Sequence, residues 1–138
     1  MKTKILLLII VSIALLSITT TSLFYSHYII YSMHEFKMDI EIGDHLGFNV
    51  DTDALHFGLS MSPGKATRWL NISHQNKNPL QVDIQTAGYL GSWIYIEEPS
   101  FVLEPNVNKE VTVECHIPEN IEYGHYNGTL KVIFKRII

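Results

Sequence analysis

The sequence contains very little cysteine and no excess of basic charge. Cys115 is the only cysteine among 138 residues, so no disulfide can form within the chain. Ten Lys and Arg against 14 Asp and Glu give a formal net charge of −4, and the basic residues are scattered along the sequence. This balance argues against a surface for nucleic acid. The fold must therefore rest on packing alone, or on association with another chain.

Charge of either sign is missing between Lys4 and Glu35. A bilayer core about 30 Å thick needs roughly twenty mostly apolar helical residues, and this stretch supplies them. We predict a transmembrane signal anchor over residues 5–31. Because lysines precede the anchor, the positive-inside rule places residues 1–4 in the cytoplasm and everything after the anchor outside it. The expected product is a single-pass protein of the cell membrane.

A cleaved signal peptide is the alternative, because a basic start followed by an apolar run fits both. Cleavage would release a secreted form. No A-x-A-like cleavage site follows, and the apolar character resumes at Leu23 and continues through Ile30. Tyr25, Tyr28 and Tyr31 also recur at the far end, where amphipathic rings favour the headgroup region of a membrane. These features favour the anchor.

Helical periodicity is absent after the anchor, and apolar and polar residues alternate instead. We predict a short tether at residues 32–37 and one extracytoplasmic domain at 38–138. Between seven and nine short strands are expected, near residues 38–42, 48–51, 55–60, 65–74, 80–85, 93–96, 101–103, 111–117 and 126–136. Short strands with turn residues between them indicate an all-β antiparallel sandwich.

The segment EYGHYNG resembles the acidic-x-Gly-x-Tyr pattern of immunoglobulin-like domains, in which a tyrosine bonds back to the preceding corner. Earlier segments resemble the ASH-type and CARDB-type modules of bacterial and archaeal surface proteins. That likeness is carried by Phe57, Gly58, Gly64, Arg68, Leu70, Ile72, Asn76, Trp93, Pro99, Pro105, Val111 and Val113. The resemblance implies an immunoglobulin-like sandwich used in adhesion or assembly, without catalytic residues. It places Tyr126 at the corner, with Trp93 and Tyr95 sealing the core.

Three oxygen-bearing side chains, Asn49, Asp51 and Asp53, stand at alternate positions, where an extended backbone projects them from one face. Oxygen ligands suit calcium, but Ala54 stands where a calcium loop has glycine. A solvated strand face explains the pattern better, and no cofactor is predicted. The seven histidines show neither paired spacing nor a C-x-x-C companion, and no G-x-S-x-G motif is present.

Register predicts the surroundings of two other side chains. Cys115 shares the inward register of its strand, which predicts a buried, inert thiol; at a sheet edge it would instead be free to pair between chains. Trp69 falls between residues of the buried register, so its indole is expected to face outward, where either a neighbouring loop covers the ring or the ring contacts a partner. Asn71 and Asn127 begin two N-x-S/T sequons, both in the outward register, and are candidate glycosylation sites.

Together these features predict a membrane-anchored, non-catalytic interaction or structural module of the cell envelope. Its partner would be another envelope or membrane protein, bound through a sheet edge or the Trp69 face. The alternative is a small envelope enzyme, or a metal- or carbohydrate-binding domain, for which Asn49, Asp51, Asp53 and the histidines are the candidates.

Overall fold

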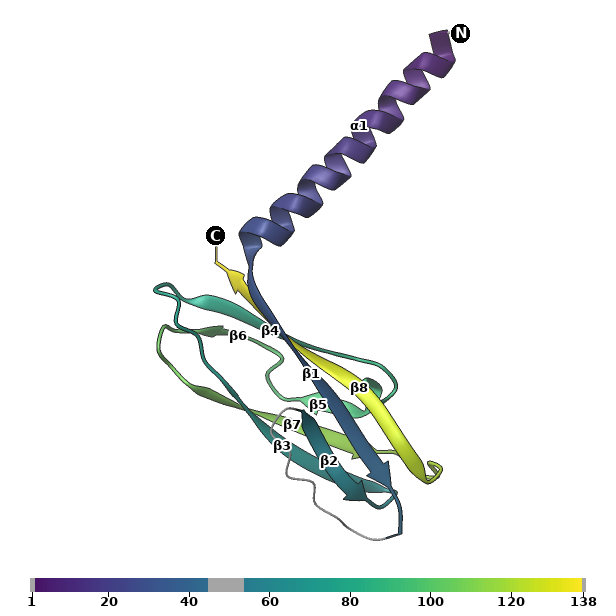
Figure 1. Cartoon of the computed structure of the whole chain (residues 1–138), viewed down its shortest axis with the longest axis vertical. Helices are drawn as coiled ribbons and strands as arrows, with labels where there is room; N and C mark the ends of the chain where they lie inside the picture. The colour runs from purple at the N-terminus through teal and green to yellow at the C-terminus, as the bar shows by residue number, and fades with distance from the viewer. Residues whose placement is uncertain (1, 45–53, 138) are drawn as a thin grey trace.

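The computed structural model describes residues 2–44 and 54–137 (Figure 1). The strand expected at 48–51 and the candidate calcium ligands Asn49, Asp51 and Asp53 lie outside the described residues.

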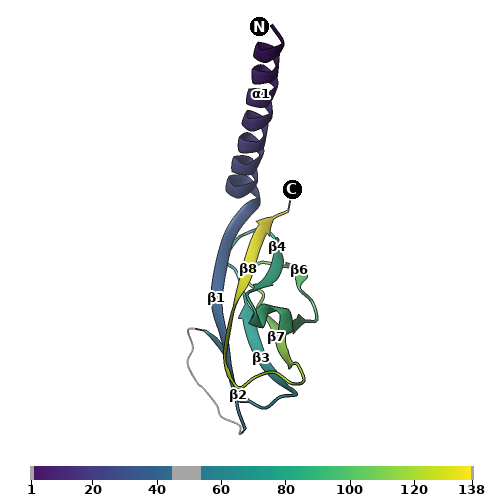
Figure 2. The ribbon, with the colours of Figure 1, turned by 90° about the vertical axis from the view of Figure 1, so that its right-hand side faces the viewer.

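The N-terminal segment is a single long helix that projects away from the rest of the chain (Figures 1 and 2). Helix α1 covers Lys2–Phe24 and continues as a π-helical turn, η1, over Tyr25–Ile29. Within Thr3–Ile29, a stretch of 18 residues reaches a mean hydropathy of 2.4, and none of that stretch is buried. By length and composition this helix is able to cross a membrane.

Strand β1, Ile30–Ile42, begins directly where the helix ends. Residues 32–37, predicted as a tether, instead form part of this strand and pair with β8. The helix also ends at Ile29, before the predicted boundary at Tyr31. The early part of β1 was missed because Ser32 and His34 occupy its inward register and hide the apolar alternation.

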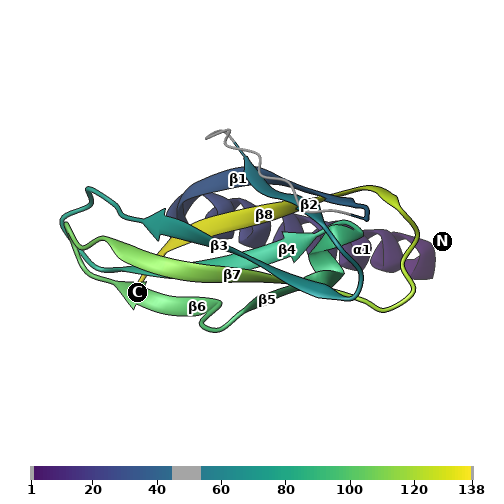
Figure 3. The same cartoon turned by 90° about the horizontal axis from the view of Figure 1, so that it is seen from below.

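Among the described residues, eight strands form two sheets (Figures 1 and 3). The five-stranded sheet has the order β2-β1-β8-β4-β6, and its other members are β2 Leu55–Ser60, β4 Leu80–Ala87, β6 Ser100–Leu103 and β8 Gly124–Arg136. The three-stranded sheet has the order β3-β7-β5, with β3 Gly64–Ile72, β7 Lys109–Ile117 and β5 Ile94–Ile96. A short 3-10 helix, η2, at Leu90–Trp93 precedes β5.

The prediction of a purely antiparallel structure is wrong at one edge. Strands β1 and β2 are parallel, whereas the other pairings are antiparallel. Parallel neighbours need a connection long enough to return the chain to the start of the first strand. Residues 43–54 provide that length between β1 and β2.

One apolar core lies between the two sheets. Alternate residues of each strand point into it, which is why the period-2 pattern located most strands correctly. Cys115 and Trp93 are buried as predicted, at 0% and 9% exposure. Burial also raises the pKa of the Cys115 thiol to about 12, so the group stays protonated.

Candidate functional site

The outer side of the three-stranded sheet is the best-developed candidate surface. Its strands are in register, so the side chains that face away from the core form rows across β3, β7 and β5. We call this surface the β3-β7-β5 face. It comprises Lys65, Thr67, Trp69, Asn71, Tyr95, Glu97, Glu110, Thr112, Glu114 and His116.

Two aromatic rings stand on this face. Trp69, opposite Thr112, is 61% exposed, and Tyr95, opposite Glu114, is 54% exposed. The outward position of Trp69 agrees with its predicted register. Tyr95 was expected in the core, and that prediction is wrong: Ile94 and Ile96 on either side of it pack against the core. The helix η2 shifts the alternation between residues 93 and 95, which places the two aromatic side chains on opposite sides.

Carboxylates surround these rings. Glu114 pairs with Lys65 at 2.6 Å and with His116 at 3.0 Å, and the hydrogen bonds that its carboxylate accepts, first from Lys65 and then from His116, lower its pKa. Glu97 and Glu110 form no ion pair with any described residue. The face therefore carries uncompensated negative charge beside exposed aromatic surface.

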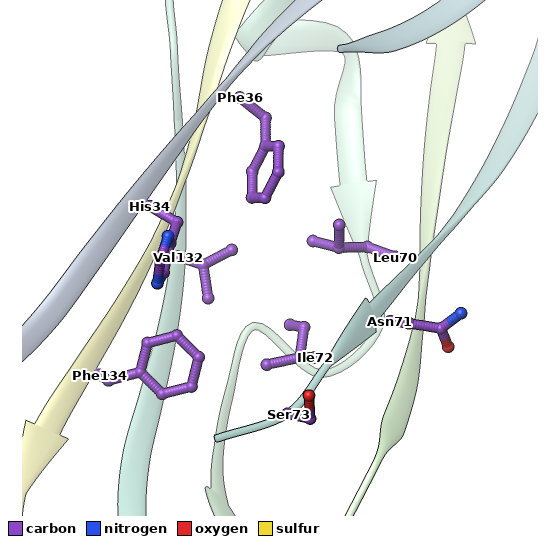
Figure 4. Close-up of a pocket in the computed structure, with 8 residues that line it drawn as sticks. All are labelled: His34, Phe36, Leu70, Asn71, Ile72, Ser73, Val132 and Phe134. Atoms are coloured by element: carbon purple, nitrogen blue, oxygen red, sulfur yellow. The ribbon is translucent and has the colours of Figure 1, made fainter. Parts of the chain in front are cut away.

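A second feature is a small apolar recess between the two sheets (Figure 4). It has a volume of about 110 Å³ and is lined by His34, Phe36, Leu70, Asn71, Ile72, Ser73, Val132 and Phe134. Ligand pockets commonly measure about 300–1,000 Å³. The recess is therefore too small for a typical organic ligand and has room for one side chain at most.

The junction between helix and sandwich forms a third feature. The guanidinium of Arg136, at the end of β8, donates hydrogen bonds to the carbonyl oxygens of Tyr28 at 2.7 Å and His27 at 3.2 Å. The adjacent Lys135 lies 5.9 Å from the ring centre of Tyr25. The two cations therefore connect the last strand to the π-helical turn, and we call these contacts the junction clamp.

Asp83 of β4 supports this clamp. Its carboxylate pairs with the Lys135 ammonium at 2.6 Å and accepts a hydrogen bond from the Ser100 hydroxyl at 2.5 Å. These hydrogen bonds, first that from Lys135, lower the pKa of Asp83, and the same carboxylate raises the pKa of Lys135. A continuous set of polar contacts thus runs from β6 across the sheet to the helix.

The histidines that the structure describes do not gather into a metal site. His56 contacts Asp39 at 2.7 Å, the buried His74 contacts the carbonyl oxygen of Leu103 at 2.9 Å, and His116 belongs to the ion pair on the β3-β7-β5 face. Within residues 2–44 and 54–137, no three His, Cys, Asp or Glu side chains lie close enough to hold a metal ion.

Tyr126 lies near the start of β8 and contacts the corner that precedes this strand. Its hydroxyl donates a hydrogen bond to the carbonyl oxygen of Glu122 at 2.7 Å, and its ring lies against Tyr89 and Trp93 at centroid distances of 5.6 and 4.9 Å. Burial, followed by the charges of Tyr89 and Glu122, raises the pKa of the phenol, which keeps it protonated as a donor. The corner is therefore held by both a hydrogen bond and ring contacts.

Both sequon asparagines are exposed, Asn71 on the β3-β7-β5 face and Asn127 on the outer side of β8.

In comparisons with protein-family models, curated proteins and solved structures, nothing matches this chain. The function of the chain is therefore inferred from its own geometry.

Proposed function

We propose that this protein is a membrane-anchored, non-catalytic interaction module of the cell envelope, whose immunoglobulin-like sandwich lies outside the cytoplasm and binds another envelope protein. The observation that carries the proposal is the pair of exposed rings, Trp69 and Tyr95, on one sheet face. Trp and Tyr are the residues that most often dominate the binding energy of protein interfaces. The lysines before the helix favour a cytoplasmic N-terminus.

The junction supports this role. A binding module on a flexible tether samples many orientations and loses that freedom on binding. Here β1 continues from the helix, and Arg136 and Lys135 connect the far end of the chain to the same turn. These contacts restrict how the domain turns relative to its helix, which would lower the entropic cost of binding a neighbour in the membrane. The hydrogen bond of Tyr126 supports the immunoglobulin-like assignment.

Site-specific photo-crosslinking in the native membrane tests the proposal. A photoreactive amino acid at position 69 or 95 of the full chain is expected to yield one discrete adduct with another protein. The same residue at position 102 is the control, because Val102 is also exposed but belongs to the five-stranded sheet. Equal adducts from all three positions, or none from 69 and 95, would contradict binding through this face.

Carbohydrate binding is a second candidate function, because the same two rings offer apolar surfaces on which sugar rings can stack. Envelope polysaccharides retained on immobilised protein, and released by Trp69→Ala or Tyr95→Ala, would favour it. Glycosylation of Asn71 would oppose both functions, since a glycan there would crowd Trp69, one row away on the same strand. Mass spectrometry of the exported protein, compared with Asn71→Gln, detects that glycan.

A further inference from the structure

We propose that the β3-β7-β5 face binds a basic segment of a different protein, with a Lys or Arg side chain over Trp69 and its charge against Glu97 and Glu110. The inference rests on the proposed function and specifies the chemistry of the partner. It follows from the arrangement of the indole and the carboxylates. It also follows from the ion pairs and hydrogen bonds that most lysines and arginines of the two sheets form within the chain.

The arrangement comes from the strand register. Trp69 lies opposite Thr112 on the central strand, and Ile96 lies opposite Val113. Glu97, the residue after Ile96, therefore lies on the far side of Thr112 from the indole. Glu110 occupies the next outward position of β7. An open hollow of about 440 Å³ begins at Thr112 and is lined by Glu97, Glu98, Lys109, Glu110, Val111 and Thr112.

The charges on this surface select a cation. The negative charge of Glu114 is offset by Lys65, and that of Glu98 by Lys109, whereas Glu97 and Glu110 have no cationic partner among the described residues. A Lys or Arg side chain is attracted to the face of an indole, Arg most often, and two nearby carboxylates add to the attraction. An acidic partner would be repelled by the same groups.

A second copy of this chain is a poor source for that cation. Lysines 65, 109, 131 and 135 each form an ion pair within the chain. Arg68 and Arg136 donate to backbone carbonyl oxygens. Within the described part of the two sheets and their connections, this leaves Lys37 and Lys77. Two identical copies with a net charge of −4 each also repel one another. The basic segment therefore belongs to another protein.

A peptide titration tests the inference. The probe is a synthetic peptide of alternating arginine and threonine, and its glutamate counterpart is the control; each is added to the full chain in uncharged detergent micelles. Fluorescence reports on the indole, because Trp69 is exposed and Trp93, the other tryptophan, is buried. We expect the arginine peptide to bind and its Kd to rise about tenfold between low salt and roughly 0.5 M salt, where the screening length falls to a few ångströms.

Charge-matched variants identify the surface. The double variant Glu97→Gln/Glu110→Gln is expected to raise Kd at least tenfold, and Trp69→Ala, followed by isothermal titration calorimetry, to weaken binding similarly. The control Glu41→Gln/Glu119→Gln removes the same charge from exposed positions outside the face and is expected to leave Kd unchanged. Circular dichroism confirms that each variant is folded.

Equal binding of the two peptides, or equal effects of the two double variants, would overturn the inference. So would a concentration-dependent dimer that Trp69→Ala abolishes, since the occupant would then be a second copy. If the arginine peptide fails while crosslinking from position 69 still gives a discrete adduct, the face is an interface for a partner that is not basic. Failure of both experiments would remove the proposed function as well.

Discussion

Neutralising Asp83 should loosen the contacts that join the sandwich to the N-terminal helix. The variant Asp83→Asn keeps the size of the side chain but removes the charge that holds Lys135. The two side chains are 21% and 23% exposed, intermediate between surface and core. Exposed ion pairs contribute about 0.2–1 kcal/mol, and hydrogen bonds to charged groups about 1.5–3 kcal/mol. We therefore expect a loss of about 1–2 kcal/mol in the free energy of unfolding.

Urea unfolding of the full chain in detergent micelles, followed by the fluorescence of buried Trp93, measures this loss. In a domain of this size, each kcal/mol corresponds to roughly 4–8 °C in Tm. A double-mutant cycle with Lys135→Met separates the pair from its surroundings, and the expected coupling energy is about 1 kcal/mol. Strictly additive single variants would refute the conclusion that the pair is energetically coupled.

The pH dependence gives an independent check. Because the folded-state pKa of Asp83 lies below its ordinary value of 3.8, its contribution is complete above that value and is lost as the pH falls through the folded-state pKa. Lys135 has the opposite sign: its pKa lies above 10.5, so its contribution is complete below 10.5 and is lost as the pH rises further. The stability difference between wild type and Asp83→Asn should therefore disappear under strong acid. A difference that persists there would refute the electrostatic explanation.

Three other predictions concern the interior and its corner. Cys115, buried and with its pKa raised to about 12, should resist iodoacetamide in the folded protein and react when urea exposes it; labelling at neutral pH without denaturant would contradict its burial. Gly128→Ala should cost about 1–3 kcal/mol in a thermal melt, because the new Cβ would lie 2.9 Å from a carbonyl oxygen of β4. Tyr126→Phe should lower Tm by removing the hydrogen bond to Glu122, whereas Tyr123→Phe, at a 71% exposed side chain, should not; equal melts would show that the corner hydrogen bond is dispensable.

Most of the fold could be predicted because each strand buries one face. Leu80, Val82 and Ile84 alternate with polar residues, and all three are buried in β4 as that pattern requires. Alternation carries no information about which strands become neighbours, so the parallel pairing of β1 with β2 could not be derived from it. The start of β1 was missed for a related reason: His34, in the inward register, is exposed to solvent and did not need to be apolar.

Only part of the candidate site could be predicted from the sequence. Trp69 was predicted to face outward because Leu70 and Ile72 define the inward register of its strand. Tyr95 was assigned to the core because it lies two residues after the buried Trp93. Residues two apart face the same side of a sheet only when they belong to one uninterrupted strand. The 3-10 helix Leu90–Trp93 ends between them. The distribution of charge on the β3-β7-β5 face depends on which strands lie side by side, and sequence spacing does not reveal that.

The position of the helix limits where a partner of the proposed kind can lie. Strand β1 begins where the π-helical turn ends, and it bends away from the helix axis (Figure 1). The junction clamp joins the end of β8 to the same turn. If the helix crosses the bilayer, the two sheets begin at the membrane surface without a tether between them. The proposed partner must then be a membrane protein or lie close to that surface.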